Sequence, residues 1–197
     1  MKNFQAAATP TAGIAPRAAP RRGSIIPADR DAAEVVTGGR GVHLTNLQKP
    51  FWPALRITKG DLLRYYELLA PVLLPHLADR AMVMKRYPHG AGGPFFFMKR
   101  APSPRPGWLR VCSIEHASGS VIDFPVVDDL ASLLWLVNLG CIDLNPWYAR
   151  CDDVNRPDYL HFDLDPVPPA GFAAVRDAAL TVRDALRALD IPSLAKT

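Results

Sequence analysis

The chain has 197 residues, of which 49% are hydrophobic, and its formal net charge is +4. This length and composition are typical of one globular domain with a real core, with or without a tail. Residues 1–40 hold six basic and three acidic side chains, so most of the excess positive charge lies in this segment. Bulk charge therefore does not indicate nucleic-acid binding by the rest of the chain, where any DNA contact must come from local clusters.

Residues 1–40 are also rich in Ala, Pro and Arg. We expect a disordered extension there, because such a segment buries too little apolar surface to offset its ordering entropy, and we expect order to begin near Gly41. Three cysteines without a C-x-x-C pair argue against a disulfide framework or a zinc site and favour a reducing cytosol. No apolar run reaches the roughly 18 residues that a membrane span needs.

The first predicted helix follows Thr58, which forms a capping box with Asp61. Pro71 and Pro75 should bend or break the end of this helix. Four short strands come next, and Ser118-Gly119 predicts a hairpin turn between the last two. The expected strands are 81–86, 95–98, 108–116 and 120–124.

The second half of the chain predicts two further helices and one strand. Asp128 is the expected N-cap of a helix that Gly140 ends. The remaining expected segments are a loop over 145–158, a strand over 159–165 and an amphipathic helix over 172–189. Alternating helices and hairpins predict an α+β class with antiparallel sheet.

The predicted strand over 159–165 carries two carboxylates. Alternation places His161, Asp163 and Asp165 on one strand face, with the two aspartates roughly 7 Å apart at Cα. Both carboxylates resist being charged together unless a cation neutralises them, and hard oxygen ligands suit Mg²⁺ or Mn²⁺. The alternative is that both lie solvated at an exposed strand end, stopped by Pro166.

With these residues in place, the chain resembles the primase-polymerase domain of bacterial ligase D, a member of the archaeo-eukaryotic primase superfamily that serves non-homologous end joining. The resemblance runs from about Val42 to Thr197 and rests on an ordered set of segments. They are Leu44-Thr45-Asn46 with Lys49, Thr58-Lys59-Gly60-Asp61 with Tyr65-Tyr66, Lys85-Arg86-Tyr87-Pro88, Phe96-Phe97 with Lys99, Trp108, Leu144-Asn145-Pro146-Trp147, and Phe162-Asp163-Leu164-Asp165-Pro166.

This resemblance implies a role for each aspartate and for three lysines. Asp163 and Asp165 match the pair that binds two catalytic Mn²⁺ or Mg²⁺ ions and the triphosphate of the incoming nucleotide. Lys49, Lys59 and Lys85 match lysines that grip the 5′-phosphate of a DNA end, for which a compact ammonium is well suited. The alternative for each is an ordinary surface lysine.

Phe96 and Phe97 match an aromatic pair whose second member stacks on the template base or the nucleotide. Core packing is the alternative for Phe95 and Phe96, and the stacking role is favoured for Phe97. Asn145 stands where many family members have a histidine that lines the nucleotide site, and it can hydrogen-bond but not carry a proton. Ku is a partner implied by the resemblance.

The family continues after the match to Leu194–Thr197 with a Ser-Gly-x-x-Gly-x-His segment and a third catalytic aspartate, and neither occurs here. We therefore expect residues 41–197 to be the N-terminal part of an incomplete primase-type fold, with an uncovered apolar face and no polymerase activity of its own. A non-catalytic binder of 5′-phosphorylated DNA ends is a second interpretation. A haloacid-dehalogenase-type phosphatase, with Asp163 as nucleophile and Asp165 as general acid/base, is a remote third.

Overall fold

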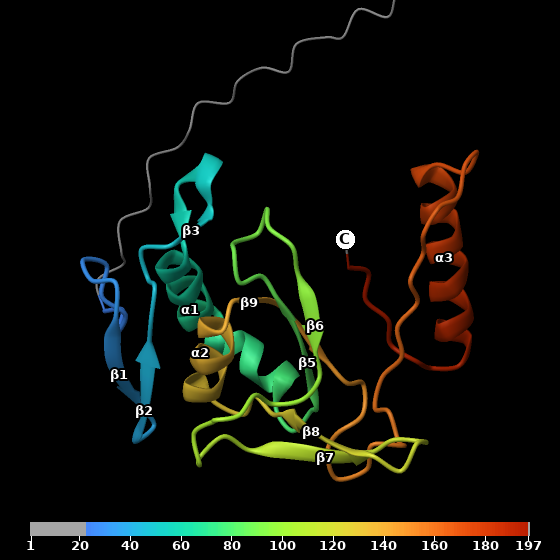
Figure 1. The fold of residues 1–197 in the computed structure, drawn as a ribbon. Helices are drawn as coiled ribbons and strands as arrows, with labels where there is room; N and C mark the ends of the chain where they lie inside the picture. The colour runs from blue at the N-terminus through green and yellow to red at the C-terminus, as the bar shows by residue number, and fades with distance from the viewer. Residues whose placement is uncertain (1–22, 197) are drawn as a thin grey trace, which may run out of the picture. The chain divides into compact units, whose positions relative to one another are not determined.

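A computed structural model describes residues 23–196 of the chain and has an α+β fold (Figure 1). The chain divides into two compact units between Asp158 and Tyr159. All strand pairs among the described residues are antiparallel. The expected α+β class with antiparallel sheet is therefore confirmed.

The first unit begins with a hairpin in which β1 (Ala33–Thr37) pairs with β2 (Arg40–Leu44). The turn uses Gly38 and Gly39, whose φ angles of 55° and 74° favour glycine. Val35 in β1 is 4% exposed and belongs to the core. The expected disordered extension over 1–40 is therefore wrong for β1, because its apolar residues pack on elements that lie far along the sequence. Residues 1–22 lie outside the described residues.

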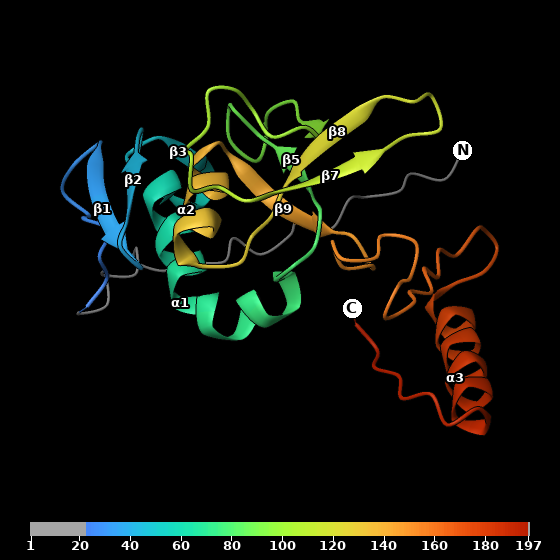
Figure 2. The same cartoon turned by 90° about the horizontal axis from the view of Figure 1, so that it is seen from below.

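Strands β3 (Pro50–Trp52) and β4 (Ile57–Thr58) flank a 3-10 helix (Pro53–Leu55) and lead into α1 (Lys59–Leu77). The predicted capping box is confirmed, since Thr58 accepts from the backbone N–H of Asp61 and Asp61 accepts from that of Thr58. The helix does not break at its prolines but runs through both to Leu77. It changes direction on the way, as Figure 2 shows.

The central sheet has the order β6-β5-β9, with β5 (Met82–Arg86) between β6 (Phe96–Met98) and β9 (Cys141–Pro146). The expected loop over 145–158 is therefore wrong at its start, because Asn145 pairs with Val83 and Pro146 with Met82. Proline is tolerated here because β9 is an edge strand and needs no donor on its open side. The predicted hairpin is confirmed as β7 (Val111–Glu115) and β8 (Val121–Pro125).

Helix α2 (Leu130–Asn138) packs against α1 and contacts β2 and β9. Its N-cap is Asp129 and not the predicted Asp128, whose carboxylate accepts from the backbone of Asp79 and pairs with Arg110. Either of two adjacent aspartates fits the sequence pattern of an N-cap. The contacts of Asp128 with Asp79 and Arg110 decide that Asp129 caps the helix. The main core lies between α1, α2 and the central sheet, and a smaller one lies between β7, β8 and the segment after β9.

In the second unit, residues 159–165 pair with no strand of the described chain, so the predicted strand is wrong. An isolated extended segment can also show apolar alternation. A β-strand needs in addition a neighbouring strand that pairs with its backbone N–H and C=O groups. The predicted amphipathic helix is confirmed as α3 (Phe172–Ala188). None of its residues is buried, and Phe172 at the start of its apolar stripe is 76% exposed.

Among residues 23–196, the helices lack the combination of length and hydrophobicity that a transmembrane span requires. Within the same residues, all three cysteines are free thiols.

Candidate nucleic-acid interface

Lys49 follows a tight turn that begins at Asn46, whose positive φ of 54° is a conformation that asparagine tolerates well. The turn closes through a hydrogen bond from the Lys49 N–H to the Asn46 carbonyl (3.1 Å). The half-buried Lys49 side chain reaches across to the segment that follows β5, where Nζ donates to the Pro88 carbonyl at 2.6 Å. Its ammonium is thus held by a neutral oxygen.

Lys59 is the first residue of α1 and is only 4% exposed. Its backbone N–H donates to the Lys49 carbonyl at 2.9 Å, and its Nζ donates to the Thr45 carbonyl at 2.6 Å. The next residue, Gly60, makes this approach possible, because a Cβ there would lie 2.9 Å from the Leu47 carbonyl oxygen. The sequence therefore needs glycine after Lys59 to bring the helix against the turn.

The charge of Lys59 is poorly compensated. Burial, together with the neighbouring charges of Lys49 and Arg86, lowers the pKa of Lys59 from 10.5 to about 8, although Asp31 opposes the shift. A cation in the first helical turn also meets the positive end of the helix dipole. Neither Lys49 nor Lys59 forms an ion pair with a carboxylate of residues 23–196. These two ammonium groups therefore favour the binding of an anion.

Arg86 is a third cation at this place, and sequence reasoning missed it as a site residue. Its Nε donates to the Leu139 carbonyl at 2.9 Å, and its guanidinium lies 5.3 Å from the ring centroid of Phe96. Burial lowers the pKa of Arg86. The sequence signal for Arg86 is its position next to Lys85 in a predicted strand. Adjacent strand residues face opposite sides of a sheet, so only one of these two side chains could lie on the same face as Lys49 and Lys59. We call Lys49, Lys59 and Arg86 the cationic cluster.

Lys85 lies on the other face of the central sheet, so the structure does not bring it together with Lys49 and Lys59. It stands opposite Phe97 in β6 and Asp143 in β9. Its Nζ is 3.2 Å from an Asp143 carboxylate oxygen, and that carboxylate also accepts from the Tyr87 hydroxyl at 3.0 Å. Hydrogen bonds to Tyr87 and Asp143 raise the pKa of Lys85. Its charge, unlike that of Lys59, is already compensated.

The neighbouring phenylalanines point to both sheet faces. Phe96 is 44% exposed and lies on the side of Arg86, whereas Phe97 is 60% exposed and lies on the side of Lys85. Phe95 is 51% exposed, and its ring meets that of Phe97 edge to face at 5.9 Å. Core packing, the alternative for Phe95 and Phe96, is therefore wrong for the part of the chain that the structure describes, because both rings stay largely exposed there.

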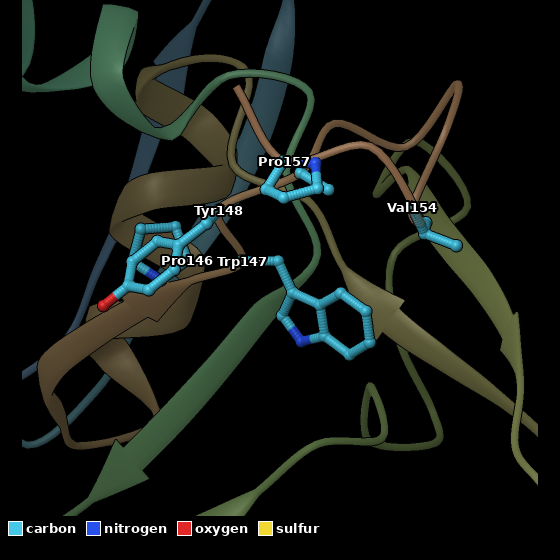
Figure 3. A pocket seen from close by; sticks show the side chains of 6 residues that line it. Pro146, Trp147, Tyr148, Val154 and Pro157 are labelled. Atoms are coloured by element: carbon cyan, nitrogen blue, oxygen red, sulfur yellow. The ribbon is translucent and has the colours of Figure 1, made fainter. Parts of the chain in front are cut away.

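Asn145 is exposed on the same sheet face as Lys85. Its Nδ2 donates to the Val83 and Asp143 carbonyls at 3.3 Å each, which leaves its side-chain oxygen available as an acceptor. Beyond it, β9 ends beside a cavity of about 360 Å³ (Figure 3). No charged side chain lines this cavity, so it is unsuited to a phosphate or a metal. The lining residues are Pro146, Trp147, Tyr148, Ala149, Val154 and Pro157.

Asp163 and Asp165 belong to the second unit, whereas the lysines, the phenylalanines and Asn145 belong to the first. Both carboxylates are exposed. Within residues 23–196 no group of three or more His, Cys, Asp or Glu side chains is arranged to hold a metal ion. Two carboxylates from one short segment have the right donor chemistry for Mn²⁺ or Mg²⁺, but they supply only part of a coordination sphere.

Comparison with known proteins agrees with this arrangement of elements. A family model described as the LigD primase-polymerase domain matches residues 58–197. The solved polymerase domain of Mycobacterium tuberculosis ligase D, in complex with DNA, superposes with a TM-score of 0.65 at 30% identity, covering 75% of this chain and 54% of that one. These matches define the class, an α+β polymerase-type domain of the ligase D kind.

The chain belongs to the LigD primase-polymerase domain family. The multifunctional non-homologous end joining protein LigD of Mycolicibacterium smegmatis is 32% identical over 152 residues, covering 76% of this chain and 20% of that protein. The bifunctional LigD of Bacillus subtilis is 30% identical over 168 residues, covering 83% of this chain and 26% of that protein. The chain thus spans about a quarter or less of these curated relatives.

Proposed function

We propose that this chain supplies the DNA-end-binding part and two metal-binding aspartates of a polymerase domain that adds nucleotides to a DNA 3′ end in non-homologous end joining. Family membership supports the class of activity, and the solved Mycobacterium tuberculosis relative is in complex with DNA. The observation that carries the proposal is the cationic cluster, in which two lysine ammonium groups donate to neutral carbonyl oxygens and form no ion pair with a carboxylate of residues 23–196. A DNA-repair role would place the chain in the bacterial cytosol.

Lys49 and Lys59 would hold the 5′-phosphate of a recessed DNA end, with the guanidinium of Arg86 beside them. Lys59 is buried beside the like charges of Lys49 and Arg86. A phosphate dianion would compensate its positive charge. Lys85, already paired with Asp143, would take no part in holding this phosphate. Nucleoside triphosphates would approach the other sheet face, where two carbonyls hold the Asn145 amide nitrogen and its amide oxygen would accept a hydrogen bond.

Asp163 and Asp165 would hold divalent ions, which when bound would activate the primer 3′-hydroxyl and stabilise the leaving pyrophosphate. Their carboxylates have the donor chemistry that Mn²⁺ and Mg²⁺ prefer. Because the two side chains supply only part of a coordination sphere, we expect weak binding that tightens when a nucleotide triphosphate adds its own oxygens. Titration of Mn²⁺ by electron paramagnetic resonance tests this, with Asp163→Asn and Asp165→Asn expected to abolish the nucleotide-dependent increase.

The test of end recognition is binding to a recessed duplex with and without a 5′-phosphate. Lys49→Ala and Lys59→Ala should each remove most of the preference for the phosphorylated end, and Lys85→Ala should preserve it. Lys196→Ala is the matched control, because Lys196 is an exposed lysine of the second unit. Equal affinity of the unsubstituted chain for both duplexes would contradict the proposal.

A second candidate is a non-catalytic binder of 5′-phosphorylated ends. The observation that favours it is that the cationic cluster lies entirely in the first unit, whereas both aspartates lie in the second. Phosphate-dependent binding without nucleotide addition in the presence of Mn²⁺ would select this candidate. Ku remains a partner suggested by family membership. The phosphatase alternative loses its basis, because Asp163 does not end a strand and the family model covers the segment.

A further inference from the structure

One exposed arginine has a backbone conformation that favours glycine. Arg56 ends the 3-10 helix Pro53–Leu55 with φ 56° and ψ 31°, and its backbone N–H donates to the Pro53 carbonyl at 3.1 Å. A residue with a Cβ is strained in this left-handed conformation, whereas glycine is not. Strain at an exposed side chain indicates that arginine serves a purpose other than the stability of this turn.

The side chain of Arg56 lines a cavity of about 420 Å³ beside the hairpin of β3 and β4, which leads into α1 (Figure 1). Arg56 is the one charged residue among the described residues that line it. The lining residues are Gln48, Pro50, Pro53, Arg56, Ile57 and Thr58. Arg56 also forms no ion pair with a carboxylate of residues 23–196. Its guanidinium is therefore suited to binding an anion at this cavity.

The cavity is continuous in sequence with the lysines of the cationic cluster. Two of its lining residues flank Lys49, and a third directly precedes Lys59. Arg56 precedes Lys59 by three residues, so their Cα atoms lie at most about 11 Å apart. The neighbouring charges that shift the pKa of Lys59 are those of Lys49, Asp31 and Arg86. Arg56 thus lies near the cationic cluster without being part of it, and would bind a different anionic group.

This spacing suits the strand whose end the cluster would hold. Successive phosphates of one DNA strand advance about 3.4 Å along the helix axis, so the next two or three phosphates come within reach of Arg56. A guanidinium can bind phosphate oxygens through two parallel hydrogen bonds. We propose that Arg56 binds a phosphodiester of the strand whose 5′-phosphate Lys49 and Lys59 hold, with the strand running past the cavity. This rests on the proposed function, which supplies the position of the first phosphate.

Substitution at position 56 should then change stability and DNA binding in opposite directions. Arg56→Gly suits the φ of 56° and should raise the midpoint of urea unfolding, but it should weaken binding to a recessed duplex. Arg56→Gln keeps a side chain in the strained conformation, so it should weaken binding without raising the midpoint. A lower midpoint in Arg56→Gly would show that the arginine stabilises the fold, and would overturn the proposal.

Binding is measured by fluorescence anisotropy with the 197-residue chain and recessed duplexes that carry or lack a 5′-phosphate. Arg56→Gln should weaken binding to both duplexes by the same factor, about threefold, and reduce the slope of log affinity against log salt by about one. Lys49→Ala should instead remove the preference for the phosphorylated end. Unchanged affinity in Arg56→Gln would overturn the proposal.

Arg187→Gln is the matched control, because Arg187 is an exposed arginine of α3 that forms no ion pair with a carboxylate of the described residues. It removes the same charge from the second unit and should leave affinity unchanged. An equal loss in this control would mean that net charge, and not the position of Arg56, determines binding, which would overturn the proposal.

A change in the DNA locates the contact. Uncharged methylphosphonates in place of the first three linkages after the 5′-phosphate should weaken binding of the unsubstituted chain. On this duplex Arg56→Gln should cause little further loss, because the two changes remove the same interaction. A full further loss would show that Arg56 acts on another part of the DNA, and the proposal would fail.

The same titrations separate this proposal from the one on which it rests. Retained phosphate preference with no effect of Arg56→Gln would overturn the Arg56 contact alone. Equal affinity of the unsubstituted chain for both ends, with the effect of Arg56→Gln preserved, would instead contradict the 5′-phosphate site of Lys49 and Lys59. If Arg56→Gln changes self-association in analytical ultracentrifugation and leaves DNA affinity unchanged, the cavity forms a protein contact and the proposal fails.

Discussion

At the scale of single residues, the environment of each cation decides what it can bind. Lys59 and Lys85 are both lysines in segments that match the family, but Lys59 is buried against carbonyl oxygens, whereas Lys85 pairs with Asp143. The pKa shifts follow this difference, downward for Lys59 and upward for Lys85. A lysine whose charge is uncompensated gains more from a phosphate than one that already has a carboxylate.

The lowered pKa of Lys59 predicts a pH dependence of end binding. Below about pH 8 its ammonium is charged and can pair with a phosphate, and above this value the proton is lost. The preference for a 5′-phosphorylated duplex should therefore decrease as pH rises, by about tenfold one unit above the pKa. Fluorescence anisotropy at pH 7 and pH 9 measures it. Lys59→Arg, which keeps its charge, should flatten the profile, and an unchanged slope in that variant would show that another group titrates.

At the scale of elements, sequence patterns predict the structure correctly where the two residues that interact lie close together in the sequence. The capping box of α1 is confirmed because Thr58 and Asp61 find each other within one turn. The strand over 159–165 failed because its pattern needs a partner strand that residues 23–196 do not provide. The same reason explains why β9 was missed, since only the register with β5 makes Asn145 a strand residue.

Loss of the α1 cap should have a small and measurable effect on stability. Thr58→Ala removes the hydroxyl that accepts from the Asp61 N–H and should lower the free energy of unfolding by about 1 kcal/mol. Thr58→Ser retains the hydroxyl and should lose only a few tenths of this amount. Urea unfolding followed by circular dichroism compares the two. Equal destabilisation by both substitutions would mean that the methyl group, and not the cap, carries the effect.

At the scale of the whole molecule, the buried core is concentrated in the first unit. Leu63 in α1, Leu134 in α2 and Met84 in β5 are fully buried and belong to one cluster. No residue of α3 in the second unit is buried, and the central residues of its apolar stripe are at most half-buried. Stability should therefore depend on the first unit.

A pair of leucine substitutions tests this distribution. Leu134→Ala should lower the free energy of unfolding by about 2–5 kcal/mol, because it removes contacts and leaves a cavity in a packed core. Leu160→Ala, at a side chain that is 56% exposed, should change it by no more than about 0.5 kcal/mol. Chemical denaturation of both variants provides the comparison. A large effect at Leu160 would indicate that residues 159–196 contribute a core of their own.

The sequence by itself determined the family, the α+β class, the capping box, the β7–β8 hairpin and α3, because these depend on ordered motifs and on neighbours a few residues apart. Only the tertiary structure decided which side chains share a surface. It separated Lys85 from Lys49 and Lys59, joined Arg86 to the latter two, and exposed Phe95 beside Phe97. The physical reason is the register of the central sheet, which sets the facing residues of three strands that lie far apart in sequence.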